Sequence, residues 1–180
     1  MQKLVHPLEK LVEIITYKGV EFEVVERPDI LWVGCVDYAD NNEGESDIGA
    51  TLKRYREELI DTPKHELIIH DYSASLSLNY GTNDKPNGLM FAQETYSNKQ
   101  DNHYDLFTVP GSLWIRTSEN ESTDTALFSR KNHGLWEYFG MLGAAAEENG
   151  YKRADLDIAI EYYNQSGVGL HYAYMPIIVK

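Results

Sequence analysis

The sequence is poor in cysteine and in basic residues, and it contains no long apolar run. Its one cysteine, Cys35, cannot form an internal disulfide, so the fold does not require an oxidising compartment. No segment approaches the ~18 apolar residues of a membrane helix, and we expect a cytoplasmic protein without a membrane partner. Only 16 Lys and Arg accompany 29 Asp and Glu, for a net charge of −13. Because phosphate binding requires clustered basic side chains, this charge argues against nucleic acid as a direct partner.

The sequence also lacks the spacings that mark metal sites and common catalytic centres. His70 and His171 have no His or Cys beside them at metal-ligand spacing, and the acidic run over 40–47 lacks the ligand order of a calcium loop. There is no phosphate-binding glycine loop, nucleophile elbow or Ser-His-Asp order. We therefore expect neither a metal nor a cofactor.

Aromatic residues are abundant, with 13 Tyr, 5 Phe and 3 Trp among 180 residues. Aromatic ring faces attract cations, so an acidic chain rich in rings suits a flat, cationic, apolar ligand. The same composition is also typical of an aromatic core beneath an acidic surface. Composition alone favours this second interpretation.

The chain contains two short echoes at nearly the same offset. "ERPDILWVG" (26–34) is matched by "TVPGSLWIR" (108–116), with the prolines and the tryptophans 82 residues apart. "GLMFA" (88–92) is matched by "GLHYA" (169–173) at an offset of 81. Two matches at nearly one offset predict an internal duplication of about eighty residues.

The hydrophobic pattern predicts an α+β domain over 1–180, made of two β-β-α-β-β units at about 20–96 and 104–179. We expect antiparallel sheets related by a pseudo-two-fold, one main helix in each half, a central cleft, and a short N-terminal helical extension within 1–19. The predicted strands are 20–28, 30–39, 66–72, 88–96, 104–109, 112–119, 157–163 and 169–179, with a polar loop at 73–87 and a link at 97–103. The predicted helices lie near 6–16, from Ser46 to Pro63, and at 125–149, with Gly150 just past the last C-cap.

The order of several motifs resembles the GyrI-like superfamily, which includes the effector-binding domains of AraC-type and multidrug-responsive transcription regulators. The motifs are "VVERPDILWVG", "VPGSLWI", "LWEYFGMLGAAAEENGY", "AIEYY" and "YMPI". They span most of the chain from about residue 20. No segment before that residue is long enough for a helix-turn-helix domain, so we expect a stand-alone form.

The resemblance implies a duplicated domain whose aromatic cleft, often with an acidic residue, binds cationic lipophilic compounds. Glu161 matches the acid, and Trp114 matches the aromatic residue of the turn motif. Tyr172 and Tyr174 fall on the closing strand. The candidate ligand-binding residues are Glu161, Trp114, Tyr172, Tyr174, Tyr163 and Trp136. Strand alternation leaves another interpretation of Glu161 open, because it places this residue opposite Ile160, as in an ordinary solvated strand position.

Three functions fit these residues. The first is binding of a cationic, aromatic or amphiphilic small molecule, with Glu161 matching the ligand charge. The second is a protein-interaction module like the gyrase-inhibitor members of the family, with a protein partner on the acidic surface. The third, implied by hydrolase members that open strained rings in toxins, uses Glu161 to position a water and Tyr172 to assist. We rank binding first, interaction second and catalysis third.

Overall fold

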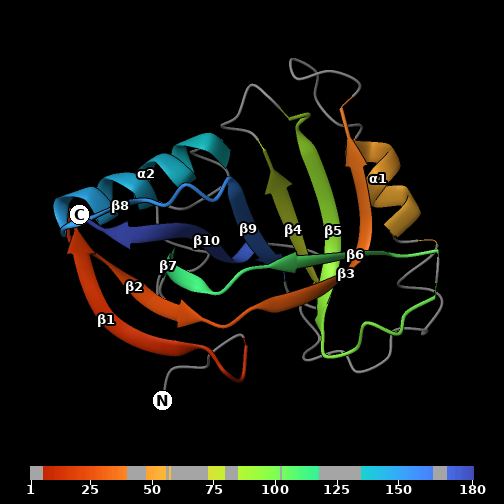
Figure 1. Cartoon of the computed structure of the whole chain (residues 1–180). Helices are drawn as coiled ribbons and strands as arrows, with labels where there is room; N and C mark the ends of the chain where they lie inside the picture. Colours follow the sequence, from red (N-terminus) through yellow and green to blue (C-terminus); the bar gives the residue numbers. More distant parts are fainter. Residues whose placement is uncertain are drawn as a thin grey trace.

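The computed structural model describes residues 6–39, 48–55, 57, 73–79, 85–101, 103–117, 135–163 and 170–180. Strands form most of this part of the chain, and Figure 1 shows them as one curved sheet with a helix near each end. The strands are β1 Lys10–Tyr17, β2 Val20–Arg27, β3 Ile30–Tyr38, β4 Ser73–Leu78, β5 Gly88–Thr95, β6 Asp105–Val109, β7 Ser112–Thr117, β8 Tyr151–Arg153, β9 Ile158–Tyr163 and β10 Leu170–Val179. The helices are α1 Ile48–Tyr55 and α2 Leu135–Glu148. The architecture is therefore α+β.

The sheet follows the order β1-β2-β7-β10-β9-β4-β5-β3-β6, and β8 adds to β10 outside this path. All of the strand pairs are antiparallel. From β2 to β6, the order can be followed inward from both ends. The strands met in turn are then β2 and β6, β7 and β3, β10 and β5, and β9 and β4, and the two members of each pair occupy corresponding positions. The arrangement on the two sides of the β9–β4 pair is thus equivalent.

The register around the two matching tryptophans is also equivalent. Trp32 pairs with Glu94 on β5 and with Phe107 on β6. Trp114 pairs with Pro176 on β10 and with Val25 on β2, and each of these partners lies 82 residues from its counterpart. The repeated Pro-x-x-Leu-Trp motif therefore occupies corresponding places in the sheet.

The two proline turns that introduce this motif contact each other. The Gly111 amide donates a hydrogen bond of 2.6 Å to the Asp29 carboxylate, and these two positions are 82 residues apart. A Cβ atom at Gly111 would lie 3.1 Å from the Arg27 carbonyl oxygen and from the Asp29 nitrogen. Glycine therefore permits the close approach of the two turns.

The predicted N-terminal helix is wrong, because residues 10–17 form β1. β1 pairs with β2 through the tight turn at Lys18-Gly19, where both residues have positive φ, 50° and 79°. Two left-handed residues are the geometry of a type I′ hairpin, which joins adjacent antiparallel strands. Leu11, Ile14 and Ile15 fit a helical spacing in sequence, but the hairpin turn determines the structure.

The predicted loop over 73–87 is also wrong in part, because its first residues form β4. "SASLSL" alternates serine with apolar residues, and Ala74, Leu76 and Leu78 are buried while the serines face the other side of the sheet. The strand predicted at 66–72 lies outside the described residues.

Most of the other predicted elements are confirmed. β2, β3, β5, β6, β7, β9 and β10 fall within the predicted strands, to within one or two residues. α1 and α2 lie within the predicted helices, whereas Ser46, Pro63 and residues 125–134 lie outside the described part of the chain. Gly150 follows α2 with φ of 88°, as a C-terminal cap residue does. The short strand β8 was not predicted.

The two faces of the sheet have different character. On one face, here called the aromatic face, tryptophan and tyrosine rings pack with aliphatic side chains; its buried members include Trp32, Trp114, Tyr162, Tyr172, Tyr174, Leu76 and Ile160. On the other, here called the helix face, α2 packs Leu142, Ala145 and Ala146 against Ala173 and Met175 of β10. Figure 1 shows α2 along this side of β10, and α1 beside β3 and β5.

The sheet curls around the aromatic face. Arg27 on β2 contacts Glu94 on β5 at 2.5 Å, although four strands separate β2 from β5 in the sheet order. The curling brings side chains from both halves into one buried layer, and its tryptophans, tyrosines and arginines are fully shielded from solvent.

Candidate functional site

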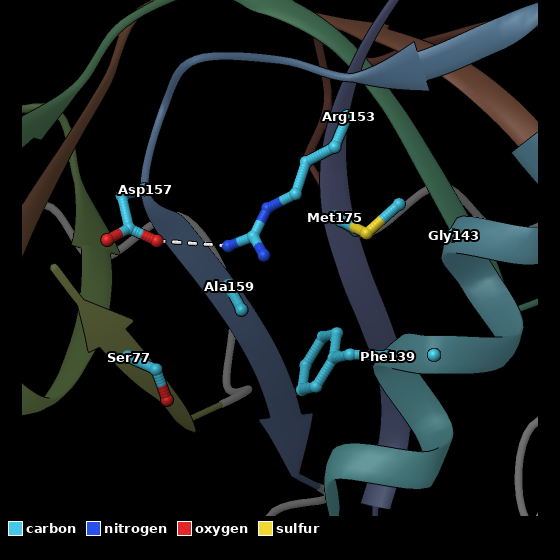
Figure 2. A pocket seen from close by; sticks show the side chains of 8 residues that line it. Ser77, Phe139, Gly143, Arg153, Asp157, Ala159 and Met175 are labelled. Atoms are coloured by element: carbon cyan, nitrogen blue, oxygen red, sulfur yellow. Dashed lines mark hydrogen bonds and ion pairs between the residues drawn. The ribbon is translucent and has the colours of Figure 1, made fainter. Parts of the chain in front are cut away.

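A groove of about 270 Å³ opens on the helix face, between α2 and the strands β4, β9 and β10. Figure 2 shows Phe139 and Gly143 of α2 on one side and Ala159 and Ser77 of the strands on the other, with Met175 between them. Apolar atoms form most of its wall. Its size lies just below the range of typical small-molecule pockets.

An ion pair closes one end of this groove. Arg153, at the end of β8, donates a hydrogen bond of 3.0 Å to the carboxylate of Asp157, just before β9. The Arg153 side chain is 52% exposed, so the pair contributes little to stability. The pair places both signs of charge on the lining of the groove.

Two glycines of α2 line the groove although the helix does not need them for packing. A Cβ atom at Gly140 would meet nothing within 4 Å, and one at Gly143 would meet only the Met175 Cε atom, at 3.9 Å. Glycine inside a helix costs about 0.5–1 kcal/mol relative to alanine. The helix therefore gives up stability at the two positions where a side chain would narrow the groove.

Glu161 lies on the same face as the groove, further along β9. It pairs with Ser75 of β4, whose hydroxyl donates a hydrogen bond of 3.2 Å to the carboxylate. The next same-face pair on these strands is Ala159 with Ser77, and both residues line the groove. Glu161 is 5% exposed, so a carboxylate is buried about 7 Å from the groove wall, two strand residues away.

The aromatic face contains a buried ionic cluster that was not predicted from the sequence. Arg27 contacts Glu94 at 2.5 Å and the Glu9 carboxylate at 3.1 Å, and it also donates a hydrogen bond to the Tyr162 hydroxyl. Its guanidinium carbon lies 4.6 Å from the ring centre of Tyr174, within cation–π distance. Two carboxylates and several rings thus surround one cation.

A second arginine completes this ionic cluster. Arg116 contacts Glu23 at 2.5 Å and Glu9 at 2.7 Å, and it donates a hydrogen bond to the Tyr174 hydroxyl. Its guanidinium carbon lies 4.8 Å from the ring centre of Tyr172. Glu9 therefore bridges the two arginines. The ionic cluster consists of Glu9, Glu23, Arg27, Glu94, Arg116, Tyr162 and Tyr174.

The ionic cluster changes the acidity of its members. Burial raises the pKa of Glu9, and the nearby Arg27 and Arg116 only partly oppose this rise. Burial also raises the pKa of Tyr162 and of Tyr174 well above their ordinary value, so both stay neutral hydrogen-bonding groups. Three carboxylates face two guanidinium groups, and a fully ionised cluster would bury one net negative charge.

The structure separates the predicted site residues into two groups. Trp114, Tyr172 and Tyr174 come together on the aromatic face, where Trp114 and Tyr174 are packed with their ring centres 6.4 Å apart. Glu161 lies on the opposite face, beside the groove. The side chains of Tyr163 and Trp136 lie outside those that the structure describes.

This separation removes one proposed pair. Glu161 and Tyr172 belong to opposite faces of the sheet, so they cannot act together on one substrate as the hydrolase hypothesis requires. No group of three or more His, Cys, Asp or Glu within the described residues is arranged to hold a metal ion. No helix within the same residues is long and apolar enough to cross a membrane.

The missed residues carried a signal in sequence. Alternation along β2 places Glu23, Val25 and Arg27 on one face, and Arg116 stands within the apolar strand "SLWIRT". A charged residue on the buried face of a strand must find a partner, since an isolated buried charge is very costly. Glu94 and the carboxylate partners of Arg116 lie more than sixty residues away from these arginines in sequence, and the sequence does not identify them. Glu9 is nearer to Arg27 in sequence, but the predicted helix hid their contact.

The chain matches no protein-family model and no curated protein. Its fold is similar to solved structures. SAV2435 bound to tetraphenylphosphonium has a TM-score of 0.59 with 14% identity, over 87% of this chain and 93% of that chain. A putative bacterial transcription regulation protein from Staphylococcus aureus MU50 has a TM-score of 0.59 with 15% identity, over 88% and 99%. The EcmrR C-terminal domain has a TM-score of 0.55 with 10% identity, over 89% and 99%.

These similarities extend over nearly the whole of the chain and of each neighbour, but the identities are low. They concern the fold alone. The neighbours include a protein bound to tetraphenylphosphonium and the C-terminal domain of EcmrR, and this chain shares their fold.

Proposed function

We propose that the protein binds a cationic, aromatic or amphiphilic small molecule in the groove between α2 and the sheet. The observation that carries this proposal is the pair of helix glycines, Gly140 and Gly143, which keep open an apolar groove at a cost in helix stability. A groove retained at such a cost is explained by an occupant. The tetraphenylphosphonium bound to a protein of similar fold supports a lipophilic cation as that occupant.

Glu161 provides the charge complement in this proposal. Since Glu161 lies about 7 Å along the strand from the groove wall, its attraction for a ligand cation is at most about 2 kcal/mol at an effective dielectric constant near 20. This energy corresponds to roughly thirtyfold in affinity. Phe139 and Met175 provide apolar contact area, and aromatic and thioether groups both suit a polarizable cation.

The proposal includes an internal duplication as the origin of the fold. Three observations support two related halves. The strand order is the same when followed from either end, Trp32 and Trp114 have partners at the same offset of 82 residues, and Asp29 contacts Gly111. Glu161 and its partner Ser75 belong to the exchanged strands β9 and β4, and they meet at the centre of the sheet. The carboxylate that we propose for ligand recognition therefore lies close to the proposed symmetry axis.

Calorimetric titration with benzyltrimethylammonium and with tetraphenylphosphonium tests the binding proposal. We expect saturable binding to the wild type and at least tenfold weaker binding to Glu161→Gln. Glu148→Gln is the matched control, because Glu148 is exposed on α2 and loses the same charge. Gly143→Leu should abolish binding by filling the groove, and Gly143→Ala should weaken it while stabilising the fold.

Two results would contradict the proposal. Equal affinity of Glu161→Gln and the wild type removes this carboxylate from the site. Full binding by Gly143→Leu removes the groove itself. Neutral benzyl alcohol separates charge recognition from simple apolar binding, since its affinity should not depend on Glu161.

A further inference from the structure

The carboxylate of Glu9 occupies a site built by other parts of the chain. Arg116 Nη1 lies 2.7 Å from Glu9 Oε1, and Arg27 Nε lies 3.1 Å from Oε2. The Tyr174 hydroxyl lies 3.2 Å from both carboxylate oxygens. These three residues belong to β2, β7 and β10, whereas Glu9 lies before β1 and outside both predicted repeats. The contacts show how this site binds a carboxylate.

The two arginines do not depend on Glu9 for charge neutralisation. Arg27 retains Glu94 at 2.5 Å, and Arg116 retains Glu23 at 2.5 Å. Glu9 is the third carboxylate beside two cations, and its removal leaves the ionic cluster neutral. We therefore expect the protein to fold without the Glu9 carboxylate.

The site holds more hydrogen-bond donors than Glu9 satisfies. Arg27 Nη1 and Trp114 Nε1 are fully buried, and neither has a hydrogen-bond acceptor within the described residues. Guanidinium and indole groups donate and never accept. An additional acceptor, and not an additional donor, is what this part of the aromatic face lacks.

Glu9 reaches the site from a turn that is closed by hydrogen bonds between neighbouring residues. The Glu9 amide donates to the His6 carbonyl at 3.0 Å, and the Leu8 amide donates to the His6 ring at 3.1 Å. Pro7 and Leu8 are exposed, with Leu8 60% accessible to solvent. The segment precedes β1, the first strand in the sheet order, so it can open without breaking the strand pairs of the sheet core. Opening does break the contact between the buried His6 ring and the Tyr96 ring, whose centres lie 6.3 Å apart.

We propose that Arg27, Arg116 and Tyr174 form a binding site for a small organic carboxylate, and that Glu9 occupies this site until the His6–Glu9 turn swings away. The site is distinct from the groove, because it lies on the opposite face of the sheet. An entering carboxylate takes over the contacts of Glu9, and Glu9 gains hydration.

Replacement of Glu9 by alanine gives a direct test with acetate. The glutamate side chain beyond Cβ has the same heavy atoms as acetate, so the Glu9→Ala variant leaves a space that acetate fits. We expect acetate to raise the thermal midpoint of Glu9→Ala saturably and to bind it at least tenfold more tightly than the wild type. Acetamide at equal concentration, and sodium chloride at equal ionic strength, should not have this effect.

Two variants serve as controls. Glu21→Ala removes the same charge from an exposed position on β2 and should respond to acetate like the wild type. Glu9→Gln fills the site with a neutral side chain and should show no acetate effect. Gly143→Leu, which blocks the groove, should leave the acetate response of Glu9→Ala unchanged, so this proposal and the binding proposal fail separately.

The proposal is overturned if natively folded Glu9→Ala responds to acetate no more than to acetamide or chloride. If Glu9→Ala does not fold without acetate but folds with it, the proposal is supported. If it folds under neither condition, amide exchange of the wild type decides. Acetate should then accelerate exchange at Leu8 and Glu9 relative to acetamide, and equal exchange rates would overturn the proposal.

Discussion

Corresponding positions in the two halves of the sheet carry very different side chains. Arg116 of β7 pairs with Glu23 and Tyr174, and the residues 82 positions away, Gly34 with Asp105 and Ala92, form the same cross-strand row. The first row is fully buried and has Arg116 at its centre, whereas the second has Gly34 at its centre and Ala92 beside it. Asp105 of the second row pairs with Arg54 of α1, at 3.3 Å. The same cross-strand register therefore accommodates a charged network in one half of the sheet and a close backbone contact in the other.

The comparison shows that the fold does not require the ionic cluster. Arg27 corresponds to Val109, which is an ordinary buried member of the apolar layer. The strands β2, β7, β9 and β10 provide most of the polar groups, and Glu9 adds one from outside the two predicted repeats. Since a buried ion pair seldom adds net stability over an apolar pair, these groups are better explained by a specific role than by folding.

The largest expected effect comes from breaking the ionic cluster at Arg27. Arg27→Met removes one cation and leaves Glu94 and Glu9 buried without it, so we expect a loss of about 3–5 kcal/mol in the free energy of unfolding. Its counterpart Val109→Ala loses two methyl groups, or about 1.5 kcal/mol. Urea unfolding measures both. Equal losses would mean that the two halves are energetically alike and would break the comparison.

A smaller loss is expected at the close contact of the other half. A Cβ atom at Gly34 would lie 2.0 Å from the Phe91 carbonyl oxygen and 2.7 Å from the Ala92 Cα atom, both backbone atoms. Gly34→Ala must displace β5 and should cost about 1–3 kcal/mol, as overpacking does.

Gly140→Ala is the matched control for this substitution, because its new methyl group meets nothing within 4 Å. It should stabilise α2 by about 0.5–1 kcal/mol. Thermal unfolding of both variants under one condition should show a lower midpoint for Gly34→Ala and a higher midpoint for Gly140→Ala. A neutral Gly34→Ala would show that the strands β3 and β5 have room to separate.

Much of the fold followed from the sequence because its signals are local. The Pro-x-x-Leu-Trp repeat located β3 and β7, and the alternation around Glu161 correctly placed Ile160 and Tyr162 on the opposite face. β1 was predicted as a helix because its apolar spacing suits both periods, and the Lys18-Gly19 turn that decides the outcome is only two residues long.

The candidate site was less predictable, because its parts meet only through the curling of the sheet. Glu94 comes from a segment distant from Arg27, and no spacing in the sequence indicates their contact. Glu9 stands next to Arg27 only because β1 and β2 form a hairpin where a helix was predicted. The groove could not be predicted either, since it depends on how α2 sits on β9 and β10. Gly140 and Gly143 were the one local feature of the sequence that relates to the groove, and they indicate a groove only once the empty space beside them is known.

The smallest effect we predict concerns the pH dependence that Glu9 adds to one half and not to the other. Because burial raises the pKa of Glu9 above its ordinary value of 4.5, the stability it contributes is present below about 4.5 and is lost as pH rises through the folded pKa. Arg27 and Arg116 oppose the shift, which limits its size. Glu9→Gln removes this titration, so the stability of the wild type relative to the variant should fall as pH increases. Urea unfolding of both proteins across pH 4 to 8 (roughly the range that brackets an ordinary and a raised carboxyl pKa) measures the difference. A relative stability that instead rises with pH would mean that the arginines, and not burial, control the pKa of Glu9.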